Sequence, residues 1–255
     1  MPKVISNLII TFLSTKYQLE IAVFNCTAAI EAAAAGADRI ELCHNQPEGG
    51  TTPSPGTIWQ VRQKLTIPIF AMLRPRGGDF IYNSNELAVM KKDLEAIKNG
   101  GCYGIVFGFL QLDGTVDKKL TSRFVEMAYP LDATFNRAFD CTPNAGEALE
   151  AIIDCGCQRI LTSGQHTTAP EGAAIIQQIV TQANNRIIIM PGAGIRQQTI
   201  TAVQKATGAV EFHSSALKII STQSTYTNAK VTGMENFYGV DASEIRAMKE
   251  QLAKL

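Results

Sequence analysis

The sequence predicts a single (β/α)8 TIM barrel, an α/β fold with a parallel eight-stranded sheet and an outer ring of helices. Short apolar segments rich in Ile, Val and Phe recur from end to end, and segments of helical composition separate them. They repeat roughly every 20–35 residues, which is the period of such a barrel. A doubly wound open sheet is the alternative, but it usually has fewer strands, and no G-x-G-x-x-G motif follows the first predicted strand.

The elements follow from this alternation of apolar and helical segments. Asn25, Ser84, Asp117 and Asp241 are candidate helix N-caps. The stretch 216–240 is the longest predicted to be irregular, and a loop of that length is usually functional or an interface. The predicted strands are 19–24, 37–43, 67–73, 103–110, 132–137, 158–163, 186–192 and 209–215. The predicted helices are 27–35, 56–65, 84–99, 118–128, 144–155, 169–184, 195–206 and 241–254.

No linker or shift in composition divides the chain, so residues 18–255 are predicted to form one barrel domain after an N-terminal extension, 1–17. No apolar run approaches the ~18 residues of a spanning helix, so no membrane partner is expected. The 23 basic and 23 acidic residues balance without a basic block, which argues against nucleic acid as a partner. Six cysteines are too sparse for a disulfide scaffold, which favours the cytoplasm.

Charged side chains alternate with apolar ones in three of the predicted strands. Glu20, Arg39, Glu41, Glu211 and His213 fall on faces opposite the apolar residues. Helices cover the outside of a barrel, and an unpaired buried charge costs several kcal/mol, so we expect these side chains to point inward. A structural ion-pair network, Arg39 with Glu41 or Glu211, is the favoured interpretation for Arg39 and Glu211. For Glu20, Glu41 and His213, structural and functional roles both stay open.

Barrel enzymes place their chemistry at the C-terminal ends of the strands. All three histidines are predicted to lie there. Guanidinium groups bind planar anions bidentately, so the arginines suit a carboxylate or phosphate, although pairing with Asp79, Asp140 and Glu41 would also explain them. The motif PGAG at 191–194 fits either phosphate binding or a tight turn. The candidate site residues predicted at this end include Cys26, Cys43, His44, Arg74, Arg76, Asp79, Arg137, Asp140, Ser163, His166, Gly192, Gly194, His213 and Ser214.

Seven strings, GADRIELC, EGGTTPS, RPRGGDF, FNRAFD, RILTSG, MPGAGI and EFHSSA, resemble the CutC copper-homeostasis family in order and spacing, from about residue 18 to 218. The resemblance implies a (β/α)8 barrel, a cytoplasmic homodimer or larger homo-oligomer, and copper handling. It also implies copper ligands at the ends of the first two strands. Cys43 matches the second, Ala22 stands at the first, and Asn136 replaces a family histidine. Cu(I) prefers thiolates, so Cys26 or His44 would have to complete the site.

The sequence therefore predicts a CutC-family copper homeostasis protein that binds Cu(I) at the barrel mouth through Cys43 with Cys26 or His44. The alternative is an enzyme with isomerase- or lyase-like acid–base chemistry on a small anionic or sugar-like metabolite. A scaffold that only binds partners, through the N-terminal extension and 216–240, is a third hypothesis. No organic cofactor is evident. In the enzyme, Glu20, Glu41, Asp140 and His213 would be catalytic, and Arg74, Arg76, Asp79, Arg137, Ser163, Gly192, Gly194 and Ser214 would bind the ligand.

Overall fold

The computed structural model describes residues 16–228, 230–231, 233 and 236–255. Residues 1–15 of the predicted extension lie outside this part of the chain, so the extension stays a prediction. The eight strands of the barrel are β1 (Gln18–Val23), β2 (Arg39–Leu42), β3 (Ile69–Met72), β4 (Gly104–Phe107), β5 (Asp132–Phe135), β6 (Arg159–Thr162), β7 (Ile188–Pro191) and β8 (Glu211–Ser214). The helices are α1 (Cys26–Ala34), α2 (Pro55–Lys64), α3 (Ser84–Asn99), α4 (Lys118–Ala128), α5 (Ala145–Asp154), α6 (Ala173–Ala183), α7 (Ile200–Thr207) and α8 (Ala242–Ala253).

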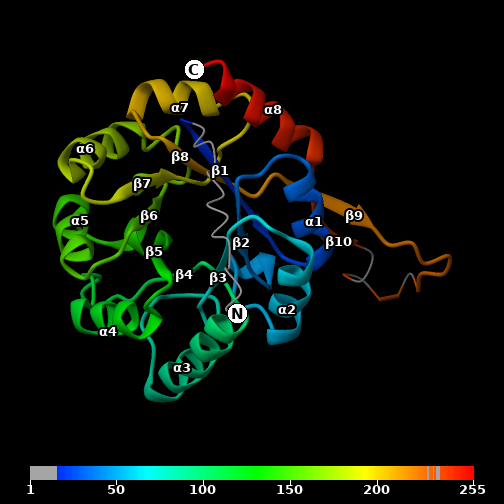
Figure 1. Cartoon of the computed structure of the whole chain (residues 1–255), viewed down its shortest axis with the longest axis horizontal. Coiled ribbons are helices and arrows are strands. Elements are labelled where there is room, and N and C mark those ends of the chain that lie inside the picture. Colours follow the sequence, from blue (N-terminus) through cyan, green and yellow to red (C-terminus); the bar gives the residue numbers. More distant parts are fainter. Residues whose placement is uncertain (1–15, 229, 232, 234–235) are drawn as a thin grey trace, which may run out of the picture.

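The strands form one parallel sheet in the order β7-β6-β5-β4-β3-β2-β1-β8. The end strands β7 and β8 lie against each other, so the sheet curls into a nearly closed barrel. The helices form a ring around it (Figure 1). The predicted (β/α)8 TIM barrel is confirmed. No helix in the described ranges is both long enough and apolar enough to cross a membrane.

Side-chain alternation sorts the strand residues into two layers. Ile40 and Leu42 belong to the large apolar core that the sheet shares with the helices. Cys43 belongs instead to a small second cluster with Phe70 and Met72. Because successive side chains of a strand point to opposite faces, this second cluster and the charged residues of β1, β2 and β8 fill the inside of the barrel.

Three of the four predicted N-caps are confirmed, and one is wrong. Asn25, Asp117 and Asp241 each accept a backbone N–H of the helix that follows. The cap of α3 is Asn83, because its side chain accepts from the amide of Glu86 while the Glu86 carboxylate accepts from the amide of Asn83. Ser84 is the first helical residue.

The two helices α6 and α7 begin later than predicted. Helix α6 starts at Ala173 instead of 169, after a segment in which the backbones of Gly172 and Gly164 pack closely. Helix α7 starts at Ile200 instead of 195. Before it, the amide of Arg196 donates to the Thr199 hydroxyl at 2.9 Å, which holds a separate turn.

The stretch 216–240 was predicted to be irregular, and this prediction is wrong for part of it. It contains an antiparallel pair of strands, β9 (Leu217–Ser221) and β10 (Asn236–Val240). This hairpin extends away from the barrel (Figure 1). Its base is anchored, because the Asn25 amide donates to the carbonyl of Tyr238 at 2.7 Å. β-Branched residues in β9, and aromatic and β-branched residues in β10, favour the pairing.

Candidate functional site

The register of the strands brings acidic and basic side chains together inside the barrel. Strand β1 pairs with β2 on one side and with β8 on the other. As a result Glu20 lies opposite Arg39 on β2 and opposite His213 on β8, while Ala22 lies opposite Glu41. Each of these charged side chains is predicted to point inward, and their contacts show that they do.

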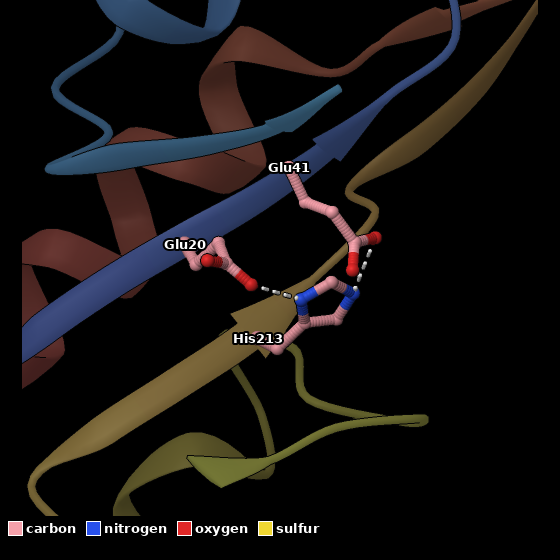
Figure 2. Close-up of side chains that lie close together, drawn as sticks. All are labelled: Glu20, Glu41 and His213. Carbon is pink, nitrogen blue, oxygen red and sulfur yellow. Dashed lines mark hydrogen bonds and ion pairs between the residues drawn. The ribbon is translucent and has the colours of Figure 1, made fainter. Parts of the chain in front are cut away.

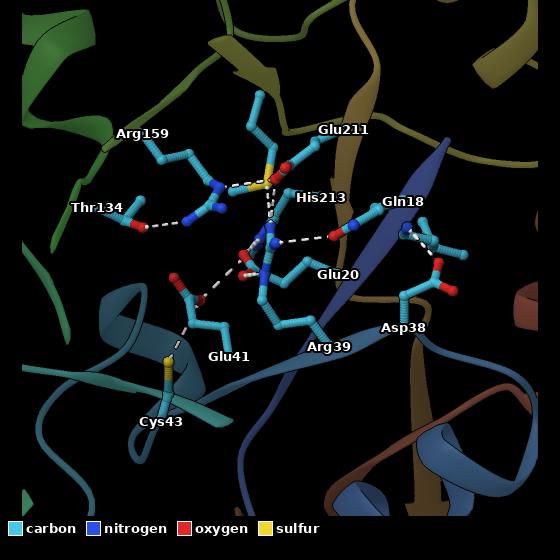
Figure 3. A network of polar contacts seen from close by, with 12 residues as sticks. Gln18, Glu20, Asp38, Arg39, Glu41, Cys43, Thr134, Arg159, Glu211 and His213 are labelled. Atoms are coloured by element: carbon cyan, nitrogen blue, oxygen red, sulfur yellow. Dashed lines mark hydrogen bonds and ion pairs between the residues drawn. The ribbon is translucent and has the colours of Figure 1, made fainter. Parts of the chain in front are cut away.

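An ion-pair network lies inside the barrel, close to the N-terminal ends of β2, β6 and β8. Arg39 donates through Nε to Glu20 at 2.5 Å and through Nη2 to Glu211 at 2.8 Å. Arg159 donates through Nε to the same oxygen of Glu211 at 2.7 Å (Figure 3). The predicted pairing of Arg39 with Glu211 is confirmed, and the second partner of Arg39 is Glu20 instead of Glu41. Two arginines and two carboxylates thus balance their charge out of contact with water.

Arg159 is a member of this network that the sequence did not single out. It shares its face of β6 with Leu161, which lines the cavity described below. The same alternation that identified Arg39 in β2 would have identified it.

Glu20 is completely buried and yet charged. Burial acts to raise the pKa of its carboxyl, but Arg39 and His213 outweigh that effect and hold the pKa well below its usual range. A carboxylate that meets cationic and hydrogen-bond donors on both oxygens keeps its charge even without solvent. Glu20 therefore serves as a fixed negative charge beneath His213.

His213 stands between two glutamates (Figure 2). Its Nδ1 lies 2.8 Å from Oε1 of Glu20, and its Nε2 lies 3.8 Å from Oε2 of Glu41. Burial acts to lower the pKa of His213, but Glu41 and Glu20 raise it above the ordinary value of 6.5. Burial also raises the pKa of Glu41, against the opposing effect of His213. Each of these two groups is thus shifted by the other and by burial, which is common for groups that transfer protons.

One oxygen of Glu41 has no hydrogen-bond partner among the described residues. Oε2 accepts from the Cys43 thiol at 3.4 Å, whereas Oε1 is buried and has no partner in the described part of the chain. Burial and the neighbouring Glu41 raise the pKa of Cys43 well above that of a free thiol, so Cys43 keeps its proton. An unpartnered buried carboxylate oxygen is costly, and a hydrogen-bond donor on a ligand would satisfy it.

Three side chains inside the barrel lie close enough together to hold a metal ion. Across the described residues, Glu20, Glu41 and His213 are brought together with donor atoms within 4.8 Å of one another. This oxygen and nitrogen set suits a harder divalent cation, whereas Cu(I) favours thiolates. Cys26 begins α1, and His44 contacts the Thr57 hydroxyl at 3.1 Å, so neither joins this group. The cluster fits Cu(I) poorly.

A cavity of about 450 Å³ opens above this cluster. Its walls come from the C-terminal halves of several strands and from the loops that follow them, which is where barrel enzymes carry their chemistry. Glu41 and His213 both line it. Of the other predicted site residues, those that line it are Arg74, Arg137, Asp140, Gly194 and Ser214.

Arg74 organises the cavity wall. It donates through Nη1 to the carbonyls of Glu48 and Gly50 at 2.7 and 3.0 Å, and through Nη2 to the carbonyl of Gly78 at 2.7 Å. It makes none of the ion pairs with Asp79, Asp140 or Glu41 that would have explained it structurally. Its Nε is buried and has no partner within the described chain.

Arg76 points away from the cavity and onto the surface of the barrel. Its guanidinium pairs with Glu86 of α3 at 2.5 Å and with Asp79 at 2.9 Å, so the predicted pairing with Asp79 is observed. Neither Arg76 nor Asp79 lines the cavity. Their contacts fasten the loop after β3 to α3.

Arg137 lies at the cavity edge and is held from behind by Asp140. Asp140 accepts from Nε of Arg137 at 2.8 Å, and also from the hydroxyls of Thr162 and Ser163 and the amide of Gln165. Arg137 itself donates to the Ser163 hydroxyl at 2.8 Å. Asp140 and Ser163 are thus placed to position Arg137.

The loop between β7 and α7 contributes residues that the sequence did not single out. Gly194 was a candidate, but Ala193, Ile195 and Arg196 line the cavity with it, as does Ser215 at the end of β8. Gly192 lies behind them, packed against Leu161 and His213. The sequence MPGAGIR could have identified Arg196, because this arginine follows closely after the glycine-rich end of a predicted strand.

Comparison with known proteins identifies the relatives of this chain. The model of the CutC family matches residues 17–218. A copper homeostasis protein cutC homolog of Homo sapiens is 42% identical over 215 residues, which are 84% of this chain and 79% of the human protein. A CutC family protein of Chromobacterium violaceum is 40% identical over 242 residues, 92% of this chain and 98% of that protein.

Solved structures agree with the fold. The crystal structure of a CutC protein from Streptococcus agalactiae superposes with a TM-score of 0.75 at 30% identity, and covers 78% of this chain and 98% of that chain. Phosphoribosylanthranilate isomerase from Thermotoga maritima superposes with a TM-score of 0.59 at 10% identity, covering 94% of this chain and 100% of that chain, and shows the barrel fold alone.

Replacing Arg39 by methionine should destabilise the barrel strongly. The change leaves Glu20 buried without its cationic partner, which typically costs about 3–5 kcal/mol. Chemical denaturation followed by circular dichroism measures the loss. Arg186→Gln, which breaks an exposed pair with Glu150, is the matched control and should have far less effect. Equal losses in the two variants would contradict the role given to Arg39.

The titration of His213 should depend on Glu41. In the folded protein the pKa of His213 lies above 6.5, so protonation of His213 stabilises the fold below that pH and the contribution is lost as pH rises through the folded pKa. Glu41→Gln removes the main charge that raises the pKa, and the midpoint should fall. NMR of the imidazole ring measures it, with the exposed Glu126→Gln as control. A midpoint that ignores Glu41→Gln would refute the coupling.

Proposed function

The chain belongs to the CutC family, which includes the copper homeostasis proteins of human and mouse, and we propose that its barrel mouth is an acid–base active site for a small anionic metabolite. The observation that carries this proposal is the placement of His213. One ring nitrogen is held by the charged Glu20, and the other faces Glu41 at the wall of the cavity. Barrel position, geometry and shifted pKa values all favour proton transfer there.

The chemistry follows from this arrangement. Glu20 accepts the Nδ1 proton of His213, which leaves Nε2 to take or give a proton on the cavity side. Glu41 is the second group that can exchange that proton. Such a pair can remove a proton beside a carbonyl of the ligand and return it to a neighbouring atom, which is isomerase chemistry, or promote elimination, which is lyase chemistry.

The arginines and their partners divide the remaining work. Arg137 provides positive charge at the cavity edge, and Asp140 acts by positioning it instead of by transferring protons. Arg74 shapes the wall through its three carbonyl contacts. Arg76, Asp79 and the backbone around Gly192 contribute to stability.

Deuterium uptake tests this function. A mixture of small carboxylated and phosphorylated carbonyl compounds is incubated with the protein in D2O, and NMR follows the loss of C–H signals beside the carbonyl. His213→Gln should slow the exchange at least about a hundredfold, since general acid–base groups contribute that much. Glu126→Gln is the control and should exchange as the wild type does. Uptake by none of the compounds, or unchanged uptake in His213→Gln, would reject the proposal.

Binding of Cu(I) is a second candidate, supported by the family and by one observation. The Cys43 thiol is buried inside the barrel, in the same small cluster as Met72, whose side chain carries a thioether. Both are soft donors of the kind that Cu(I) prefers. Cys26 and His44 would complete the predicted ligand set only after rearrangement, so the acid–base site is the function that the geometry supports best.

Competition with a Cu(I) chelator under anaerobic conditions tests the second candidate. If Cys43 is a ligand, Cys43→Ser should retain far less Cu(I) than the wild type. Cys102→Ser removes a buried thiol near the other end of the barrel and should retain as much as the wild type. Equally low retention by wild type and Cys43→Ser would exclude this candidate.

We further propose that the protein is cytoplasmic and assembles as a homodimer or larger homo-oligomer. All six cysteines are free, which supports a reducing compartment. Self-association rests on the family resemblance, and light scattering measures it directly.

A further inference from the structure

We infer that the ligand of the acid–base site is a hydroxylated phosphomonoester, whose phosphoryl group is bound by Arg196, Ser215 and the backbone amides of residues 193–195. We call this group of donors the phosphoryl subsite. The inference rests on the proposed function, because it names the class of molecule that would present its reacting end to Glu41 and His213.

The backbone of the phosphoryl subsite is a loop with unused donors. Ala193 and Gly194 both adopt positive φ angles, 65° and 80°, directly after β7. Ala193, Gly194 and Ile195 line the cavity, and their amides donate to no other group within the described residues. Consecutive free amides in such a turn are a common way to bind anionic oxygens.

Two side chains add to these amides. Arg196 is half-buried on the cavity wall, and its guanidinium has no acceptor among the described residues, whereas Arg74, Arg76 and Arg137 are all engaged. The Ser215 hydroxyl is likewise unpartnered in the described chain. Both belong to the same wall, because the neighbouring Ser214 hydroxyl donates to the carbonyl of Ile195 at 2.7 Å.

The charge of the cavity wall favours an anion at this place. Its acidic lining residues are Glu41, Glu48 and Asp140, and none of them comes from the loop after β7 or from the end of β8. Glu48 is occupied by the amide of Gly77, and Asp140 is occupied by Arg137. The phosphoryl subsite therefore contains donors only, which suits a tetrahedral oxyanion with several acceptor oxygens.

The spacing along β8 sets the length of the ligand. Ser215 follows His213 by two residues, which is about 7 Å along an extended chain. A chain of three carbons spans such a gap and would carry a hydroxyl or carbonyl to His213. There, the unpartnered Oε1 of Glu41 would accept a hydroxyl hydrogen. A cavity of about 450 Å³ has room for a molecule of this size.

Three probes separate the parts of this inference. Glycerol 3-phosphate has the phosphoryl group and the hydroxyls, propyl phosphate has the phosphoryl group alone, and D-glycerate has hydroxyls with a carboxylate. Isothermal titration calorimetry measures their affinities. Glycerol 3-phosphate should bind most tightly, and both phosphates should lose at least about tenfold in affinity in Arg196→Gln, because a charge-assisted contact is removed.

Two further variants and a control complete the design. Ser215→Ala should weaken both phosphates by a smaller factor. Glu41→Gln should weaken glycerol 3-phosphate towards the affinity of propyl phosphate and leave propyl phosphate unchanged. Arg123→Gln, an exposed arginine on α4, should alter none of the affinities. Unchanged circular dichroism in each variant shows that the fold is retained.

Each failure has a distinct meaning. Phosphate affinities that are equal in wild type and Arg196→Gln, or too weak to measure in the wild type, overturn the phosphoryl subsite. Glycerate that binds as tightly as glycerol 3-phosphate overturns the choice of phosphate over carboxylate. Equal affinities for propyl phosphate and glycerol 3-phosphate overturn the hydroxyl contact at Glu41. In all three cases the proposed function survives if deuterium uptake still depends on His213.

Discussion

The ion pair between Glu20 and Arg39 is the contact on which the inside of this barrel depends. Glu20 has no exposure to water, so its charge persists only because Arg39 and His213 meet its two oxygens. Arg39 in turn reaches Glu211, and Glu211 reaches Arg159, so four strands are joined by one charged network. An interior of this kind replaces part of the usual branched aliphatic packing and holds the imidazole of His213 in one orientation.

The arginines near the mouth have separate tasks, which their sequence positions do not reveal. Arg74 holds two loops through main-chain carbonyls, Arg76 fastens a loop to α3, and Arg137 is held by Asp140. Of the four arginines at the mouth, only Arg196 has a guanidinium without an acceptor among the described residues. Most of the arginines at the barrel mouth thus make structural contacts that hold loops in place.

Periodicity and side-chain alternation were sufficient to predict the barrel and the inward direction of Glu20, Glu41 and His213. The pairing of Arg39 with Glu211 was predicted, but its pairing with Glu20 was not, because that contact depends on strand register, which places Glu20 beside Arg39. The main-chain acceptors of Arg74 could not be predicted from the sequence either, because every residue has a backbone carbonyl. At the start of α3, adjacent Asn83 and Ser84 are both good caps, and only the reciprocal contact with Glu86 decides between them.

The layering of charge has a consequence for how the protein responds to ionic strength. Mobile ions screen charges that solvent can reach, but they do not enter a dry network. The pairs of Glu20 and Glu211 are sealed inside the barrel, whereas Arg196 is partly open to solvent at the mouth. Added salt would therefore screen the charge of Arg196 and leave the buried ion pairs almost unaffected, so ionic strength acts on the mouth of the barrel far more than on its interior.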